Sequence, residues 1–312
     1  MHVVVLGGAG FLGSHLVDSL LQRGNEVTVI DNMSSGQMKN LESAQENRSF
    51  RFIKSDICDE DHWGVLHTVP TMIFNLASPA SPTHYQRDPI GTLDAGSIGI
   101  RNILAYAQTA GSKVVHTSTS EVYGDPEVHP QSEEYVGHVN PIGPRSCYDE
   151  SKRFAEALLM NSARIGVASV SIARIFNTYG PRSSPQDGRV ISNFVFQALK
   201  GEPLTIYGTG EQTRSFCFVR DLVNGLLALA DSNIDVPVNL GNPHEVTIGE
   251  VASRIIQLAG SSSKVEYHPL PGDDPRRRRP DISRAERLLN WRPTVELNEG
   301  LIQTIEWFRS ST

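Results

Sequence analysis

The chain has 312 residues and a formal net charge of −7 at pH 7, so it can bury a large core and exceeds the usual size of one domain. The acidic balance argues against a nucleic-acid binder whose affinity rests on neutralising phosphates. The sequence has no run of about 18 apolar residues and no signal peptide before its first predicted strand, so we expect a cytoplasmic protein that does not bind membranes.

The first predicted elements are a strand, a glycine-rich turn and a helix. Residues 2–6 are apolar and rich in β-branched side chains, as in a buried parallel strand, and residues 14–23 have the pattern of an amphipathic helix. The glycines between them let the backbone turn tightly and approach a pyrophosphate, whose charge the helix N-terminus stabilises. A second strand over residues 26–30 completes the order of a dinucleotide-binding unit. The residues expected to contact the cofactor here are Gly7, Gly10, Phe11, Leu12 and Gly13.

Asp31 ends the second predicted strand, where a carboxylate can bind both ribose hydroxyls of NAD and repel a 2′-phosphate. Asn32 follows with no Arg beside it, so the sequence favours NAD over NADP. The alternative is that Asp31 only caps a loop, but the order of elements around it favours the cofactor role. Further candidates for cofactor contacts, at the ends of the next two predicted strands, are Asp56, Ile57, Leu76 and Ala77.

Strands and helices then alternate along the chain. Further strands are predicted over residues 50–53, 71–76, 113–118, 167–175 and 236–240, and further helices over residues 92–110, 147–165 and 219–230. This alternation predicts an α/β fold with a doubly wound parallel sheet of the Rossmann type and right-handed crossovers. Residues 77–82 read as a Pro-rich loop, and Gly and Pro loosen the pattern over residues 185–210. Shorter helices are predicted over residues 248–259, 283–289 and 299–309.

We expect this pattern to form two lobes. Residues 1–178 with 216–241 would make the NAD-binding domain, and residues 179–215 with 242–312 a smaller α+β lobe that binds the substrate. The three cysteines, Cys58, Cys147 and Cys217, are odd in number and widely spaced, which suggests neither a disulfide framework nor a zinc site. The ten histidines show no HExxH spacing, so we predict no metal site.

Tyr148 and Lys152 lie four residues apart on a predicted helix and therefore project from one face. A free phenol, with a pKa of about 10, is too weak a base at neutral pH, but a nearby ammonium favours the phenolate. The pair therefore predicts that Tyr148 is a general base for a sugar hydroxyl. A Tyr and a Lys at this spacing could also share a surface by chance. The upstream dinucleotide-binding unit and the strand ending at Thr119 favour the catalytic interpretation.

Sequence blocks along almost the whole chain resemble extended short-chain dehydrogenase/reductases that act on nucleotide sugars, and most closely the UDP-glucuronic acid decarboxylases (UDP-xylose synthases). The blocks are residues 77–82 (ASPASP), 117–126 (TSTSEVYGDP), 140–152 (NPIGPRSCYDESK), 173–182 (ARIFNTYGPR), 187–194 (DGRVISNF), 207–216 (YGTGEQTRSF), 239–243 (NLGNP) and 273–282 (DDPRRRRPDI). The resemblance implies tightly bound NAD, a UDP-sugar between two lobes, and a homodimer formed through the helices near residues 92–110 and 148–165.

The resemblance also implies a reaction in which UDP-glucuronate is oxidised at C4, loses CO₂ and is reduced by the bound NADH to UDP-xylose. Tyr148 would take the proton of the 4-hydroxyl, Thr119 would hydrogen-bond the same oxygen, and Lys152 would hold the nicotinamide ribose. Glu121 and Arg278 would flank the C5 carboxylate. The implied substrate-binding residues are Ser120, Tyr85, Asn177, Arg182, Arg189, Val190, Tyr207, Arg214 and Arg278.

Two other functions stay open. A 4-epimerase or 4,6-dehydratase on another nucleotide sugar is disfavoured by Ser120 and Glu121, because related dehydratases carry an Asp-Glu pair there and related epimerases small residues in place of Glu121. Epimerases also lack an Arg like Arg278. A non-catalytic NAD-binding regulator on the same fold is disfavoured because Thr119, Tyr148 and Lys152 are intact.

The arginines also have a second interpretation. Residues 276–279 form a basic run that could be solvated or bind a partner. Arg182, Arg189 and Arg214 are either surface charges or clamps for a diphosphate, whose geometry favours Arg over Lys.

The chain departs from its relatives at two positions. Gly96 stands where many of them have Asn, which removes a polar contact near the sugar or a bound water, and Ser151 replaces a more common Gly. We expect the second change to be harmless on a helix.

Overall fold

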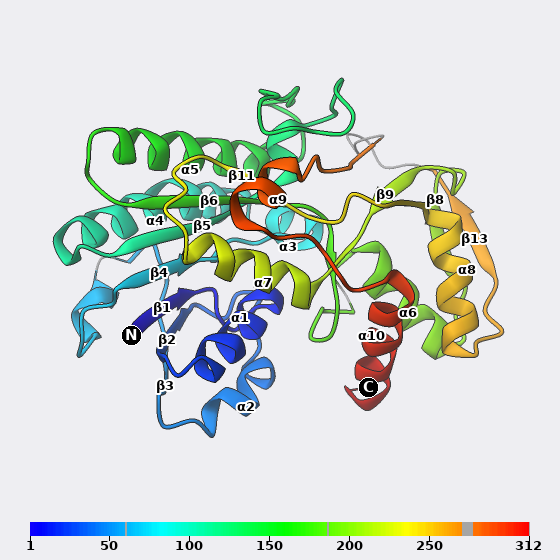
Figure 1. The fold of residues 1–312 in the computed structure, drawn as a ribbon. Helices are drawn as coiled ribbons and strands as arrows, with labels where there is room; N and C mark the ends of the chain where they lie inside the picture. Colours follow the sequence, from blue (N-terminus) through cyan, green and yellow to red (C-terminus); the bar gives the residue numbers. More distant parts are fainter. Residues whose placement is uncertain (60, 186, 270–276, 312) are drawn as a thin grey trace.

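A computed structural model describes residues 1–59, 61–185, 187–269 and 277–311 (Figure 1). Its centre is a sheet of seven parallel strands in the order β11-β6-β5-β4-β1-β2-β3. The strands are β1 (His2–Leu6), β2 (Glu26–Asp31), β3 (Phe50–Lys54), β4 (Met72–Asn75), β5 (Lys113–Thr119), β6 (Val170–Ile175) and β11 (Val238–Leu240). Because the chain order runs outward in both directions from β1 and β4, the predicted doubly wound sheet is confirmed.

Helices cover both faces of the sheet, and Figure 1 shows α4 and α5 together on one side and α1 on the other. The main covering helices are α1 (Phe11–Gln22), α4 (Pro89–Ala110), α5 (Ser146–Arg164) and α7 (Val219–Ala230). Val3 and Val5 of β1 belong to the apolar cluster that includes α1, whereas Val4 and Leu6 belong to the cluster that includes α4 and α5. Since successive strand residues point to opposite faces, a strand buried on both sides needs an unbroken apolar run.

Shorter elements connect the strands of the sheet or gather beyond its carboxyl edge. The connecting elements are η1 (Met38–Leu41), α2 (Glu42–Gln45), η2 (Asp61–Val65), α3 (Pro82–Arg87), η3 (Ser120–Tyr123) and α9 (Ser283–Leu289). Three small two-stranded sheets pair β7 (Thr178–Tyr179) with β10 (Cys217–Phe218), β8 (Leu204–Tyr207) with β13 (Val265–His268), and β9 (Thr213–Ser215) with β12 (Glu245–Thr247). The helices α6 (Val190–Lys200), α8 (Ile248–Ala259) and α10 (Leu297–Ser311) pack against one another beside them.

The region that the sequence left without regular structure contains α6 and β8. Its Gly and Pro residues stand at the ends of these elements and do not interrupt them. Gly201 ends α6 in the left-handed conformation, with φ 71°, and Pro203 precedes β8. No helix or strand was predicted here because the Gly and Pro residues obscure the pattern, although they only bound these elements. The predicted limits of α7, α8 and α9 are confirmed to the residue.

Neither a membrane-spanning helix nor a cluster of metal-binding side chains is present in the described part of the chain. None of its helices is long and apolar enough to cross a membrane. None of its His, Cys, Asp and Glu side chains form a group of three or more that could hold a metal ion.

Candidate functional site

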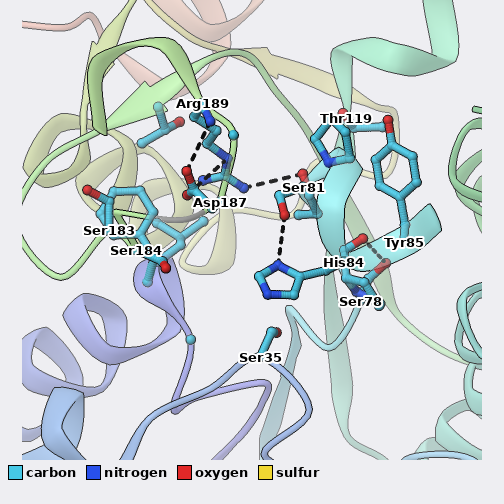
Figure 2. A pocket seen from close by; sticks show the side chains of 18 of the residues that line it. Ser35, Ser78, Ser81, His84, Tyr85, Thr119, Ser183, Ser184, Asp187 and Arg189 are labelled. Atoms are coloured by element: carbon cyan, nitrogen blue, oxygen red, sulfur yellow. Dashed lines mark hydrogen bonds and ion pairs between the residues drawn. The ribbon is translucent and has the colours of Figure 1, made fainter. Parts of the chain in front are cut away.

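A cavity of about 1080 Å³ lies at the carboxyl edge of the sheet, where the strand order reverses between β1 and β4. Ligands of doubly wound sheets bind at this kind of position. Figure 2 shows part of the lining, with Thr119 and Tyr85 on one side of the view and Ser183, Ser184 and Asp187 on the other. All the residues that the sequence singled out for catalysis, cofactor binding and substrate binding line this cavity.

The N-terminus of α1 forms one end of the cavity. Phe11, Leu12 and Gly13 are its first residues, so their N–H groups have no partner within the helix. The first turn carries no acidic side chain, and Gly10 and Gly7 leave the backbone uncovered. Since a helix N-terminus with exposed N–H groups attracts a diphosphate, this end of the cavity fits a dinucleotide.

Asp31 stands at the end of β2 with its carboxylate fixed by backbone donors. Its Oδ2 accepts a hydrogen bond from the N–H of Ala9 at 2.9 Å, and its Oδ1 accepts one from the N–H of Met33 at 2.8 Å. Burial raises the pKa of Asp31, although both hydrogen bonds act in the opposite direction. Asn32 beside it donates to Asp56 at 2.6 Å. The ends of β2 and β3 therefore form a polar edge suited to a ribose.

Thr119, Tyr148 and Lys152 converge where β5 ends. All three are buried, and the side chain of Thr119 is hydrogen-bonded to the Tyr148 phenol. The Nζ of Lys152 lies 5.9 Å from the centre of the Tyr148 ring and donates to the Thr117 carbonyl at 2.8 Å. The spacing of Tyr and Lys on α5 thus places both groups over the strand that carries Thr119.

The predicted effect of Lys152 on Tyr148 was wrong for the protein alone. Burial raises the pKa of Tyr148 to about 12, against a smaller effect of the Thr119 hydrogen bond. Burial likewise lowers the pKa of Lys152 to about 8, although the charge of Glu156 opposes the change. Removing both groups from water favours their neutral forms, and this outweighs the attraction that the sequence suggested.

Glu121 is held between two arginines. Its carboxylate accepts hydrogen bonds from Nη1 and Nη2 of Arg278 at 2.7 and 2.8 Å. It also accepts one from Nη2 of Arg145 at 2.6 Å. Arg278 also donates to Asn177 Oδ1 at 3.3 Å. Both Glu121 and Arg278 are buried. Their two parallel hydrogen bonds are charge-assisted and bidentate, and such bonds are stronger than those between neutral groups.

The family described as the NAD dependent epimerase/dehydratase family matches residues 3–242. The chain belongs to this family. Its sheet, its α1 N-terminus and Asp31 fit the NAD for which the family is named, and NAD is its cofactor.

Individual members of the NAD dependent epimerase/dehydratase family are similar over nearly the whole chain. UDP-glucuronic acid decarboxylase 1 of Xenopus tropicalis is 52% identical over 307 residues, which cover 98% of this chain and 72% of that protein. A crystal structure of UDP-glucose 4-epimerase with UDP-glucose from Thermotoga maritima has a TM-score of 0.92 at 31% identity, covering 100% and 99% of the two chains. UDP-glucuronic acid 4-epimerase from Bacillus cereus, in complex with UDP-glucuronic acid and NAD, has a TM-score of 0.90 at 28% identity and full coverage of both.

The three arginines predicted to bind a diphosphate each contact another residue of the chain. Arg182 lines the cavity but pairs with Asp18 of α1 at 2.7 Å, and Arg189 lies 3.7 Å from Asp187. Arg214 is buried and donates to the Thr213 carbonyl at 2.9 Å. Of the basic run 276–279, Arg276 lies outside the described residues, as does the DDP segment before it.

The remaining substrate-binding candidates surround the same space. Tyr85 is buried and stacks on Tyr148, with the ring centres 5.1 Å apart. Ser120 is buried at the start of η3, while Tyr207 is exposed at the end of β8 and Val190 begins α6.

The two departures from the relatives contact each other. A Cβ on Gly96 of α4 would lie 2.6 Å from the Cβ of Ser151 and 2.7 Å from its carbonyl oxygen. Gly96 therefore permits the close approach of α4 to α5, and Ser151 occupies the space beside it. Ser151 also donates from its hydroxyl to the Tyr148 carbonyl at 2.8 Å. The two substitutions thus form one packing arrangement next to the proposed base.

Sequence reasoning missed Arg145 and Asp149. Both flank Tyr148 within residues 140–152, but neither was assigned a role. Arg145 binds Glu121, which is 24 positions away, and Glu121 in turn binds Arg278, which is 157 positions away. Two charged residues within a motif that also contains Tyr and Lys were the available signal.

We predict that the protein binds NAD at least about tenfold more tightly than NADP, because a 2′-phosphate would approach the Asp31 carboxylate. Titration calorimetry with both dinucleotides measures the ratio, which Asp31→Asn should reduce. Glu26→Gln, at the exposed opposite end of β2, removes the same charge and should leave the ratio unchanged. Equal binding of NADP by the unaltered protein would contradict the assignment of Asp31.

Proposed function

We propose that the protein converts UDP-glucuronate to UDP-xylose and CO₂ with the help of bound NAD. The observation that carries the proposal is the Glu121–Arg278 ion pair beside Thr119 and Tyr148. It puts a group able to bind a sugar carboxylate next to a group able to take the proton of a sugar hydroxyl while the bound cofactor would take the hydride. The 52% identity to a UDP-glucuronic acid decarboxylase supports it.

In the first step Tyr148 takes the proton of the 4-hydroxyl and Thr119 hydrogen-bonds the same oxygen. When bound, NAD⁺ supplies a cationic acceptor for the C4 hydride and returns that hydride at the end of the cycle. With a pKa of about 12, Tyr148 needs positive charge nearby to act as a base. Lys152 provides part of it and is placed to hold the ribose.

In the second step the sugar loses its carboxylate. A ketone at C4 makes the substrate a β-keto acid, in which the carbonyl can accept the electron pair left by CO₂ as an enolate. Arg278 would bind the carboxylate and Glu121 would flank C5, with Arg145 holding Glu121 in place. Protonation at C5 and reduction at C4 then complete the pentose.

We also propose the arrangement around the site. Residues 1–178 with 216–241 would form the NAD-binding domain, and residues 179–215 with 242–312 the lobe for the UDP-sugar, since α6, β8 and β9 line the cavity. Homodimerisation through α4 and α5 is supported by exposed apolar side chains on these helices, among them Ile90, Ile98 and Phe154.

Incubation of the purified protein with UDP-glucuronate tests the function directly. We expect CO₂ and a UDP-pentose, identified by mass, without net accumulation of NADH. The similar solved structures include 4-epimerases, so UDP-glucose is the matched second substrate. Rapid conversion of UDP-glucose to UDP-galactose, with no CO₂ from UDP-glucuronate, would replace the decarboxylase by an epimerase.

Tyr148→Phe keeps the ring that stacks on Tyr85 and removes only the acid–base oxygen. Turnover should fall by about 10²–10⁴-fold, as for the loss of a general base, with little change in the affinity for the nucleotide sugar. Tyr106→Phe, in α4 against Trp63, is the matched control and should retain full turnover. Near-normal turnover of Tyr148→Phe would remove Tyr148 from the mechanism.

Arg278→Ala should slow the release of CO₂ more than hydride transfer, because Arg278 meets the carboxylate while C4 is a ketone. Enzyme-bound NADH, followed by its absorbance during a single turnover, should therefore accumulate. The control is Arg279→Ala, whose side chain is 40% exposed and 3.7 Å from Glu245. Normal decarboxylation by Arg278→Ala would leave the function standing and exclude this arginine from it.

A further inference from the structure

Asp149 is a buried carboxylate beside the proposed base. It lies in the first turn of α5 and is only 7% exposed. Its Oδ1 is fully buried, and among the described residues it has no hydrogen-bond partner. A buried carboxylate oxygen without a donor is costly as long as the group is ionised.

Charged and titratable groups surround Asp149 from several elements. Glu121 comes from η3, Arg145 from the segment before α5, and Arg278 from the C-terminal part of the chain. Tyr85 of α3 faces it as well. The neighbours on its own helix are Cys147, Tyr148 and Glu150.

Both arginines of this cluster are hydrogen-bonded to Glu121. Arg278 donates two hydrogen bonds to Glu121, and Arg145 donates a third at 2.6 Å. The described cluster therefore holds two carboxylates and two guanidinium groups, with the donors directed at Glu121. A sugar carboxylate bound by Arg278 would be a third negative charge in the same desolvated space. An added negative charge in a desolvated cluster favours the neutral form of a neighbouring carboxyl group.

We propose that Asp149 takes up a proton when the carboxylate of UDP-glucuronate enters the site, so that substrate binding is coupled to protonation of this residue. The inference rests on the proposed function, because it requires a substrate with a carboxylate next to Arg278. Asp149 then acts as a positioning and charge-balancing residue, not as a group that contacts the reacting atoms.

The ionisation of Asp149 in the free protein agrees with this role. Burial raises the pKa of Asp149 to about 7, and the negative charge of Glu121 acts in the same direction. Above pH 7 the group is therefore mostly ionised in the free protein, and a further negative charge beside it shifts the pKa higher. Proton uptake on binding follows between these two pKa values.

The stoichiometry of the reaction gives this proton a use. C5 gains a hydrogen in place of the carbon that leaves as CO₂, so each turnover from UDP-glucuronate consumes one proton. With Asp149 protonated on binding, one proton has entered the site before the carboxylate leaves. The proton that the overall reaction consumes is then taken up from solution when the substrate binds.

Titration calorimetry of the NADH-loaded protein measures the coupling, because the reduced cofactor prevents turnover. At about pH 8, titrations in phosphate and in Tris give the number of protons taken up from the dependence of the heat on the buffer. We expect close to one proton for UDP-glucuronate and about none for UDP-xylose, which lacks the carboxylate. The affinity for UDP-glucuronate alone should fall by up to about tenfold per pH unit above pH 8.

Asp149→Asn should abolish the uptake, and Asp149→Ser serves the same purpose if the Asn variant does not fold. Glu150→Gln, next to it but paired with Arg153 at the surface, should behave like the unaltered protein. Binding of UDP-glucuronate without proton uptake, or uptake that survives both Asp149 variants, would overturn the inference. Failure to release CO₂ would instead overturn the proposed function, so the two results are distinguishable.

Discussion

The ion pair between Glu121 and Arg278 joins two segments that are 157 residues apart in the chain. It ties the C-terminal segment to the carboxyl edge of the sheet, where Thr119 and Tyr148 line the cavity. A neighbouring hydrogen bond also holds this segment in place, because the side chain of Gln131 accepts from the N–H of Arg279 at 2.8 Å. A buried pair of this kind costs desolvation and is weak evidence for stability. Its value here is geometric, because it fixes a cation and an anion at one wall of the site.

Burial also decides the ionisation of the catalytic pair. Tyr148 and Lys152 are both removed from water, which raises the pKa of Tyr148 to about 12 and lowers the pKa of Lys152 to about 8. At pH 7 the phenol is therefore neutral while most of the amine is still protonated, and the phenol needs further positive charge before it can act as a base. A cationic ring and an anionic sugar are the two charges that the proposed ligands bring, and each acts on a residue poised to change its protonation state.

Local signals explain what could be predicted from the sequence. The glycine turn before α1 and the apolar run of β1 specify their structure within a few residues, and the Tyr–Lys spacing specifies one helix face. The surroundings of Arg145 and Asp149 depend on Glu121, to which Arg145 binds, and on Arg278, which also binds Glu121. No local pattern contains that information. The direction of the Tyr148 pKa was wrong for a related reason, because burial is a property of the assembled fold.

The contact between Gly96 and Ser151 also limits which residues these two positions can hold. Any side chain at position 96 would meet the carbonyl of Ser151 as well as its Cβ, so a Gly at position 151 would not by itself make room for Asn at position 96. An Asn at position 96 would have to push α4 away from the helix that carries Tyr148 and Lys152. The tolerance of position 96 to substitution is therefore set by the backbone of the neighbouring helix and not by the side chain at position 151.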